Sequence, residues 1–228
     1  MLDTCACPNS CLKEMDWKKY FDDLALTEEL DHRRVGWASS ESQCSKFATA
    51  SETINFDEVD FLLDIGCAGG HFIKMLGEKN PGRFYSGIDI SLEQIRSGDN
   101  ACLRPNLILA SMLETPFKSS CFDCVTCIGV LQNFTGSIED ALREIHRILK
   151  PGGQTVLIAM DGLYEGLEDK EKGPDAFHRY YAPEELSESL EHQGFKVLES
   201  KSIIYDREEV TRGELHESLT FYIYCRKK

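Results

Sequence analysis

The sequence lacks any run of about 18 apolar residues, which is the length that a helix needs to cross a bilayer. Its first residues, Met-Leu-Asp-Thr-Cys, also lack the basic and apolar stretches of a secretory leader. We therefore expect a cytoplasmic protein with no membrane partner.

Basic side chains are scarce relative to acidic ones. The 228 residues include 25 Lys and Arg against 39 Asp and Glu, which gives a formal net charge of -14. A field of this sign repels phosphate backbones, so we expect no nucleic-acid partner. Because hydrophobic residues make up 42% and charged residues 28%, the composition is that of a globular chain rather than of a disordered one.

The 10 cysteines are not the disulfide framework of a small secreted domain, and we expect most of them to be reduced thiols. Cys121, Cys124 and Cys127 recur at a regular spacing. On a strand, however, Cys124 faces away from the other two, so the three cannot share one metal ion.

Three further cysteines, Cys5, Cys7 and Cys11, lie close together near the N-terminus. They could bind a soft metal or a thiophilic substrate such as arsenic, although three thiols without a fixed scaffold make a poor site. We expect no bound metal.

Short apolar runs alternate with amphipathic stretches from Phe61 onward, which is the pattern of a parallel sheet with crossover helices. Because the runs are apolar throughout, each strand should be buried on both faces. The expected strands are Phe61–Ile65, Phe84–Ile88, Leu107–Ala110, Phe122–Ile128 and Gln154–Met160.

Helix signals lie between these strands. Ser91 followed by Gln94, and Ser137 followed by Asp140, resemble capping boxes, in which a side chain satisfies a free amide of the first turn. The second of these helices has one apolar stripe that can cover a sheet face, and it should end at Lys150-Pro-Gly-Gly.

A further helix should begin at Pro183 and stop at Gly194, because proline favours the first helical position and glycine the position after the last. Two strands follow, around Phe195–Ile204 and Ser218–Cys225, with the charged segment Asp206–Glu217 between them. They are expected to form an antiparallel pair.

Residues 1–55 differ from the rest, because they show helical periodicity and no convincing strand. We expect a helical cap in 1–55, packed beside or over the carboxyl edge of the sheet, and one ligand-binding domain in 56–228. The segment Asp161–Asp175 is rich in charge and glycine. It could be a lid or an ordinary surface loop.

Residues 62–72 read Leu-Leu-Asp-Ile-Gly-Cys-Ala-Gly-Gly-His-Phe, an apolar strand that runs into a glycine-rich turn and then a helix. Glycine permits a positive φ and the close approach of a ligand, and the helix N-terminus offers free amide donors. A dinucleotide fingerprint needs glycine at 66, 68 and 71, and only Gly66 meets this. The spacing therefore disfavours a nicotinamide-dependent oxidoreductase.

The pattern Asp-x-Gly-x-Ala-x-Gly from Asp64 to Gly70 resembles the first motif of class I S-adenosylmethionine-dependent methyltransferases. The resemblance spans about Phe61 to Met160 and implies an α/β, Rossmann-like fold. This fold has a seven-stranded, mostly parallel sheet with helices on both faces and an antiparallel last strand. Four further segments resemble the family in the same order, namely Gly87–Ser91, Ala110–Phe117, Phe122–Asn133 and Leu142–Gly153.

The resemblance implies S-adenosylmethionine as the cofactor, with S-adenosylhomocysteine as the product. It places Asp64 and Gly66 at the methionine end and Asp89 at the ribose, whose two hydroxyls a carboxylate can accept. The family often has Asp where this chain has Ser111. The other cofactor-binding residues that it implies are Cys67, Ala68 and Gly70 in the turn, Ile90, Ser111 and Met112 around the adenine, and Ile128 in the floor.

The acceptor of the methyl group should approach the carboxyl ends of the strands, where open α/β sheets bind ligands. His178 could take a proton from the acceptor, with Tyr180 as a second catalytic candidate, although a surface histidine and a packed tyrosine are the alternatives. The candidate substrate contacts are Trp17, Tyr20, Trp37, Gln132, Asn133 and Tyr181.

The function that these features predict is methyl transfer to a small-molecule acceptor, at oxygen or nitrogen, by a monomer or homodimer. A protein or peptide acceptor and a non-catalytic, cofactor-binding partner subunit remain alternatives. Gly129-Val-Leu-Gln stands where enzymes that methylate amino groups of nucleic-acid bases or glutamine carry Asn-Pro-Pro-Tyr. This difference argues against such acceptors.

Overall fold

The computed structural model describes residues 15–37, 39–98, 106–160, 178–209 and 215–228, without the side chains of 203–219. The predictions for Cys5, Cys7, Cys11 and the segment 161–175 lie outside the described residues. The strands of the sheet are β1 (Phe61–Ile65), β2 (Phe84–Asp89), β3 (Leu107–Leu109), β4 (Phe122–Ile128), β5 (Leu149–Met160), β6 (Phe195–Glu209) and β7 (Leu215–Lys227).

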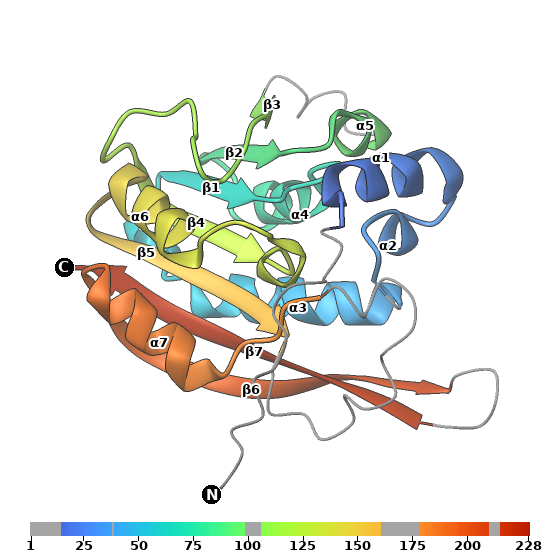
Figure 1. The fold of residues 1–228 in the computed structure, drawn as a ribbon. Helices are drawn as coiled ribbons and strands as arrows, with labels where there is room; N and C mark the ends of the chain where they lie inside the picture. Colours follow the sequence, from blue (N-terminus) through green and yellow to red (C-terminus); the bar gives the residue numbers. More distant parts are fainter. Residues whose placement is uncertain (1–14, 38, 99–105, 161–177, 210–214) are drawn as a thin grey trace, which may run out of the picture.

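Seven strands form one sheet in the order β3-β2-β1-β4-β5-β7-β6 (Figure 1). The first five strands pair in parallel, whereas β7 runs antiparallel to both β5 and β6. The predicted fold class, a mostly parallel seven-stranded sheet with an antiparallel last strand, is confirmed. The carboxyl ends of β1, β2 and β4 meet at one edge, where the glycine-rich turn lies.

Helices cover both faces of the sheet, as predicted (Figure 1). On one face, α6 (Ile138–Ile148) and α7 (Pro183–His192) close a core that includes Leu63 and Cys127. On the other, α3 (Ser40–Thr53) and α4 (His71–Lys79) close a second core with Leu62 and Cys124. Neighbouring residues of one strand thus enter different cores, which is the alternation that a strand imposes.

The predicted helix ends are also present. The Ser91 hydroxyl accepts the Gln94 N–H at 3.0 Å at the start of α5 (Leu92–Ser97), and the Ser137 hydroxyl accepts the Asp140 N–H at 3.2 Å before α6. Pro183 opens α7, and Gly194, with φ of +91°, follows its end. Local capping chemistry therefore set these boundaries.

Several strand boundaries differ from the prediction, most of all in the last three strands. The segment Asp206–Glu217, expected to be a connection, lies mostly within the β6–β7 ladder, where Asp206 pairs with Ser218 and Glu209 with Leu215. Charged side chains do not interrupt an antiparallel ladder, because backbone amides make its hydrogen bonds. Strand β5 also begins earlier, at Leu149, and shifts register before Gln154.

The N-terminal region is helical, with α1 (Trp17–Thr27), α2 (Asp31–Arg34) and α3. Helix α1 packs on α5 beside the carboxyl edge of the sheet (Figure 1). Helix α3 instead lies on a sheet face, where Ala50 and Ile54 join the same core as β1. The division at residue 55 stays a prediction, and α3 shares its core with the strands that follow.

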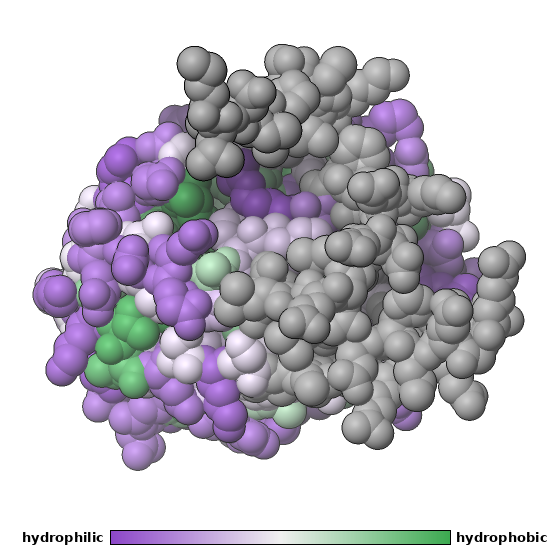
Figure 2. Space-filling model, turned by 60° about the horizontal axis from the view of Figure 1, so that its bottom comes forward, coloured by the Kyte–Doolittle hydropathy of each residue, from purple (hydrophilic) through white to green (hydrophobic). Residues whose placement is uncertain are grey.

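Hydrophilic residues dominate the described part of the surface in the view of Figure 2, with hydrophobic residues gathered in a few small patches. No helix within the described ranges is long and apolar enough to cross a membrane. The predicted absence of a membrane partner and the cytoplasmic location stay predictions.

Candidate cofactor and acceptor site

A cavity of 450 Å³ lies at the carboxyl ends of the parallel strands, within the size range of small-molecule sites. Its wall combines the glycine-rich turn, the ends of β2 and β4, the loop after β3, and residues of α1 and α3. Nine of the predicted cofactor-binding residues line it, namely Asp64, Gly66, Cys67, Ala68, Asp89, Ile90, Ser111, Met112 and Ile128.

The glycine-rich turn has the backbone that the motif predicts. Gly66 has φ of +73°, and a Cβ placed there would lie 2.2 Å from Cγ2 of Val130. Ala68 has φ of +45°, which is rare for a residue with a side chain. Gly70 has φ of +81° and caps α4 instead of lining the cavity. Its role is therefore to set the start of the helix.

Asp89 connects this turn to the end of β2. One carboxylate oxygen accepts the Ala68 N–H at 2.9 Å, and the other accepts the Ser91 N–H at 2.9 Å. Burial raises the pKa of Asp89, and these backbone hydrogen bonds oppose the rise. Each oxygen keeps a second lone pair, so the carboxylate can accept two hydroxyl groups of a ligand.

Asp64 is the second acid of the cavity, and only 4% of it is exposed. Its Oδ1 accepts the Thr126 hydroxyl at 2.7 Å. Burial raises the pKa of Asp64 to about 7, with Thr126 opposing the rise and Asp89 adding to it. An acid held in this state costs folding free energy, which is typical of a functional site.

This burial predicts a pH-dependent effect of Asp64→Asn on the cofactor-free protein. A carboxyl whose pKa is raised by folding destabilises the protein increasingly as pH rises from its unfolded value, near 4, to its folded value. One pKa unit corresponds to about 1.4 kcal/mol. The increase in the free energy of unfolding caused by Asp64→Asn should therefore be about 3 kcal/mol larger at pH 8 than at pH 5. Urea unfolding at both pH values measures this, and an equal effect at both would contradict the burial.

The loop after β3 brings Ser111 and Met112 into the wall, and α6 holds this loop in place. The Glu144 carboxylate accepts the Thr115 N–H at 2.8 Å and the Thr115 hydroxyl at 2.6 Å. Arg147 pairs with the same carboxylate at 2.7 Å. Arg147, and then Thr115, hold the pKa of Glu144 down to about 2. The loop is therefore tied to α6 by an ionised acid.

Helices α1 and α2 are fastened to α5, which begins just after Asp89. The Gln94 side-chain NH₂ donates to the carbonyl of Phe21 at 2.9 Å and to that of Arg34 at 2.5 Å. The Ser91 hydroxyl also donates to the Asp22 carboxylate at 2.5 Å. Because Gln94 and Phe21 both line the cavity, this junction connects the cofactor end to the wall built from α1.

We expect Gln94→Met to weaken the attachment of α1 and α2 to α5 without creating a cavity in the core. Methionine keeps the length of the side chain but loses both hydrogen bonds, which leaves the carbonyls of Phe21 and Arg34 without their donor. Loss of buried hydrogen bonds costs about 1–3 kcal/mol. Hydrogen exchange of the amides in 17–34 should become at least about tenfold faster. The matched change Gln193→Met, beyond the end of α7, should leave these rates unchanged.

The predicted acceptor-side residues divide into two groups. Trp37 and Asn133 line the cavity, whereas Tyr20, Gln132 and Tyr181 are not among its lining residues. The Tyr181 hydroxyl donates to the carbonyl of Leu131 at 3.1 Å, which ties its segment to the loop after β4. Gln132 is a buried residue of the same loop, and its backbone carbonyl accepts the Arg179 backbone N–H at 2.7 Å.

The two catalytic candidates, His178 and Tyr180, also lie outside the lining. The His178 ring stacks on Trp17, with centroids 5.3 Å apart and an angle of 15° between the planes. Trp17 itself lines the cavity, so the imidazole contacts a wall residue and does not line the cavity. A direct role in proton transfer stays a prediction.

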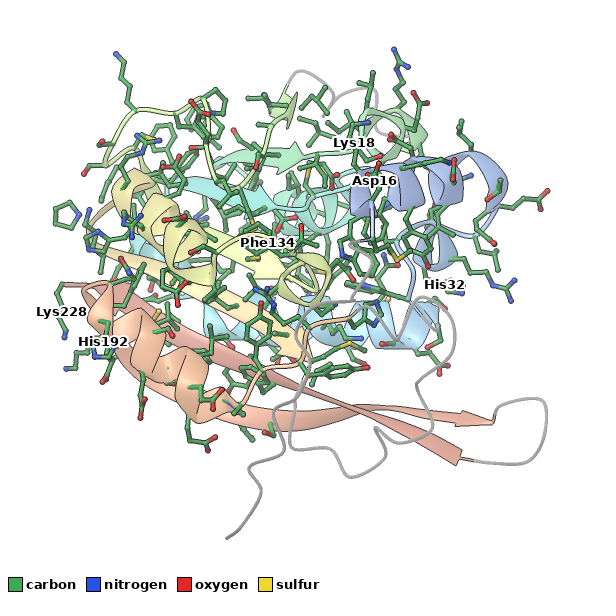
Figure 3. The ribbon with its side chains drawn as sticks, viewed as in Figure 1. Asp16, Lys18, His32, Phe134, His192 and Lys228 are labelled. Atoms are coloured by element: carbon green, nitrogen blue, oxygen red, sulfur yellow. The ribbon has the colours of Figure 1, made fainter. Side chains whose placement is uncertain are left out.

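Several lining residues escaped prediction. Phe134 and Thr135 follow β4, while Gln43 and Phe47 lie on α3 and Phe21 lies on α1. Figure 3 shows Phe134 on the loop after β4, and Asp16 and Lys18 at the beginning of α1. Trp17 and Phe21 are four positions apart, which places them on the same face of a helix. This spacing could have predicted that both side chains face the cavity.

Four of the six described cysteines are buried, whereas Cys44 is exposed and Cys121 is partly buried. Cys124 and Cys127 are fully buried, and they pack in different cores, as their alternation on β4 predicts. Burial raises the pKa of both thiols, and no described cysteine forms a disulfide. Within the described ranges no cluster of His, Cys, Asp or Glu could hold a metal ion. The expectation of no bound metal stays a prediction.

Comparisons with known proteins show what this chain is similar to. Residues 63–157 match the family model described as a methyltransferase domain. An uncharacterised protein of Methanocaldococcus jannaschii is 34% identical over 64% of this chain and 60% of its own length. A mitochondrial arginine hydroxylase of Danio rerio is 26% identical over 74% of this chain and 58% of its own. The chain thus spans about 60% of the length of these two relatives.

Two further matches are named as methyltransferases. The ubiquinone biosynthesis O-methyltransferase of Pseudomonas aeruginosa is 27% identical over 64% of this chain and 68% of its own. A possible histamine N-methyltransferase of Thermotoga maritima has a TM-score of 0.69 at 21% identity, covering 93% of this chain and 100% of its own, which shows a shared fold. The family match places a methyltransferase domain at residues 63–157, and the sheet order and the glycine-rich turn are those that the resemblance to class I S-adenosylmethionine-dependent methyltransferases implies.

Proposed function

We propose that the protein transfers the methyl group of S-adenosylmethionine to a small-molecule acceptor, at oxygen or nitrogen. The observation that supports this proposal is one cavity lined by two chemically different sets of residues. Asp64, Asp89 and the turn at Gly66 form a polar set, called the polar end, that fits the cofactor, and aromatic side chains from α1, α3 and the loop after β4 form the other set, called the aromatic end.

The residues of the polar end fit S-adenosylmethionine by their chemistry. Asp89 would accept the ribose hydroxyls, and Asp64, once ionised, would attract the ammonium of the methionine part. The positive φ of Gly66 keeps side-chain atoms out of the space beneath the ligand. Ile90, Ser111 and Met112 would enclose the adenine, and Ile128 would form the floor.

The cofactor supplies a methyl group that its sulfonium activates for in-line displacement. In the transfer, a lone pair of the acceptor forms the new bond to this carbon, the carbon–sulfur bond breaks and its electrons stay on sulfur. A proton bound to the acceptor atom leaves to water. The contribution of the chain is therefore to hold both reactants in line and to exclude water, effects that can supply much of a rate enhancement.

A small acceptor is favoured over a protein or peptide because residues of α1 and α3 contribute to the wall of a cavity of 450 Å³. The name of the P. aeruginosa relative, an O-methyltransferase of ubiquinone biosynthesis, supports the same class. A protein or peptide acceptor and a non-catalytic partner subunit are the alternative proposals. The Danio rerio hydroxylase shows that a relative can carry another activity name.

The test uses S-adenosylmethionine labelled in its methyl group, with the purified protein and a cell extract. The extract is separated into low-molecular-weight and protein fractions before the reaction. The proposal predicts labelled product in the low-molecular-weight fraction, with equal formation of S-adenosylhomocysteine, and much less product with Asp89→Ala at the same concentration of S-adenosylmethionine. Label in the protein fraction alone would contradict the small acceptor, and folded wild-type protein that transfers no label to either fraction would contradict the activity.

A further inference from the structure

The aromatic end of the cavity has a composition that restricts the acceptor. Its wall includes Trp17 and Phe21 from α1, Phe47 from α3 and Phe134 from the loop after β4. Trp37 and Phe47 meet edge to face, with ring centroids 5.6 Å apart. Aromatic rings pack best on other rings, in stacked or edge-to-face arrangements. A planar aromatic ligand therefore gains most from this wall.

Trp37 lies where the two reactants must meet. Its indole rests on the backbone just after Ile128, because a Cβ at Gly129 would come within 3.1 Å of Cζ2 and 3.3 Å of Nε1. Trp37 is partly buried, and its indole N–H makes no hydrogen bond to the residues that the structure describes, so it is open to an acceptor on a ligand. A ligand oxygen beside Gly129 would supply this acceptor.

The charges around the cavity disfavour an ionic acceptor. The basic side chains of the lining already have acidic partners, Lys18 with Asp22 at 2.6 Å and His71 with Asp31 at 3.2 Å. Asp16, Asp64 and Asp89 add negative charge that repels an anion. A cation meets a different obstacle, because the Lys46 ammonium already lies 4.9 Å from the centre of the Trp37 ring.

From this wall we propose that the acceptor is an uncharged, planar aromatic molecule with an oxygen substituent, which accepts a hydrogen bond from the Trp37 indole. The inference rests on the proposed function and adds the substrate class. It makes Trp37 a specificity-determining residue. The ring of the acceptor packs against Phe47, whose ring meets that of Trp37, and the oxygen of the acceptor faces Gly129.

The experiment measures binding by titration calorimetry to protein saturated with S-adenosylhomocysteine. The probes are 2,3-dihydroxynaphthalene, its hydroxyl-free parent naphthalene, the anion 3,4-dihydroxybenzoate, the cation dopamine and the non-planar cis-1,2-cyclohexanediol. The dihydroxynaphthalene should bind at least about tenfold more tightly than either ion, and the cyclohexanediol should show no binding. Methyl transfer from labelled S-adenosylmethionine to the dihydroxynaphthalene should be detectable.

The variant Trp37→Phe separates the ring from the N–H group. It should weaken dihydroxynaphthalene binding about three- to tenfold, the loss expected for one neutral hydrogen bond, and leave naphthalene and S-adenosylhomocysteine binding unchanged. An equal loss for naphthalene would contradict the hydrogen bond. If S-adenosylhomocysteine binds but the ions or the cyclohexanediol bind as well as the aromatic diol, the substrate class is wrong and the proposed function stands. If S-adenosylhomocysteine itself does not bind, the proposed function is wrong, and the substrate class that rests on it is wrong as well.

Discussion

Asp89→Ala is expected to weaken S-adenosylhomocysteine binding about 100-fold. The substitution removes the acceptor for both ribose hydroxyls, and hydrogen bonds to a charged group contribute about 1.5–3 kcal/mol. It also removes the acceptors of the Ala68 and Ser91 amides, so the turn and the start of α5 lose their connection. The loss should therefore exceed that for a residue that contacts the ligand alone.

Titration calorimetry measures this loss, with Asp60→Ala as the matched control. Asp60 is an exposed acid at the opposite end of β1, so the control changes the net charge by the same amount. Its affinity for S-adenosylhomocysteine should equal that of wild type. Asp89→Asn keeps one oxygen acceptor and should fall between the two. An Asp89→Ala protein that is folded and binds normally would contradict the assignment of the ribose site.

Gly66→Ala is expected to abolish measurable binding and to destabilise the protein by about 3 kcal/mol. The left-handed conformation costs an alanine about 1–2 kcal/mol, and overpacking costs a similar amount or more. The clash is with Val130, since the new Cβ would lie 2.2 Å from its Cγ2. The loop after β4 would have to move, and with it the floor of the cavity at Ile128.

Gly82→Ala separates backbone strain from the clash. Gly82 has φ of +86°, similar to that of Gly66, but a Cβ there has no atom within 4 Å. This control should lose only about 1 kcal/mol of stability and no affinity. Urea unfolding and calorimetry of both variants provide the comparison. Equal effects of the two substitutions would mean that the positive φ alone matters and that Val130 yields to the methyl group.

The sequence predicted best the features that depend on local chemistry. Continuous apolar runs identified the five parallel strands, and the hydroxyls of Ser91 and Ser137 marked the helix starts. The glycine-rich turn was recognisable because its backbone geometry restricts the residue types that it can contain. These signals lie within a few residues of the structure that they specify.

Features that depend on packing between distant segments were harder to predict. Phe47 and Phe134 enter the cavity because α3 and the loop after β4 meet at one sheet edge, 87 positions apart in the chain. The Tyr181 hydroxyl donates to the carbonyl of Leu131, a contact between segments 50 positions apart that the sequence did not indicate, and its contact with the substrate stays a prediction. The length of the β6–β7 ladder also exceeds the prediction, since backbone pairing extends into charged sequence.

The most direct test of the central claim is titration of the wild-type protein with S-adenosylhomocysteine, with NADH as the control ligand. The account predicts one site of micromolar affinity for S-adenosylhomocysteine and no binding of NADH, because the glycine spacing of the turn does not suit a dinucleotide. Folded protein that binds NADH, or that binds neither ligand, would contradict the assignment of this cavity to S-adenosylmethionine.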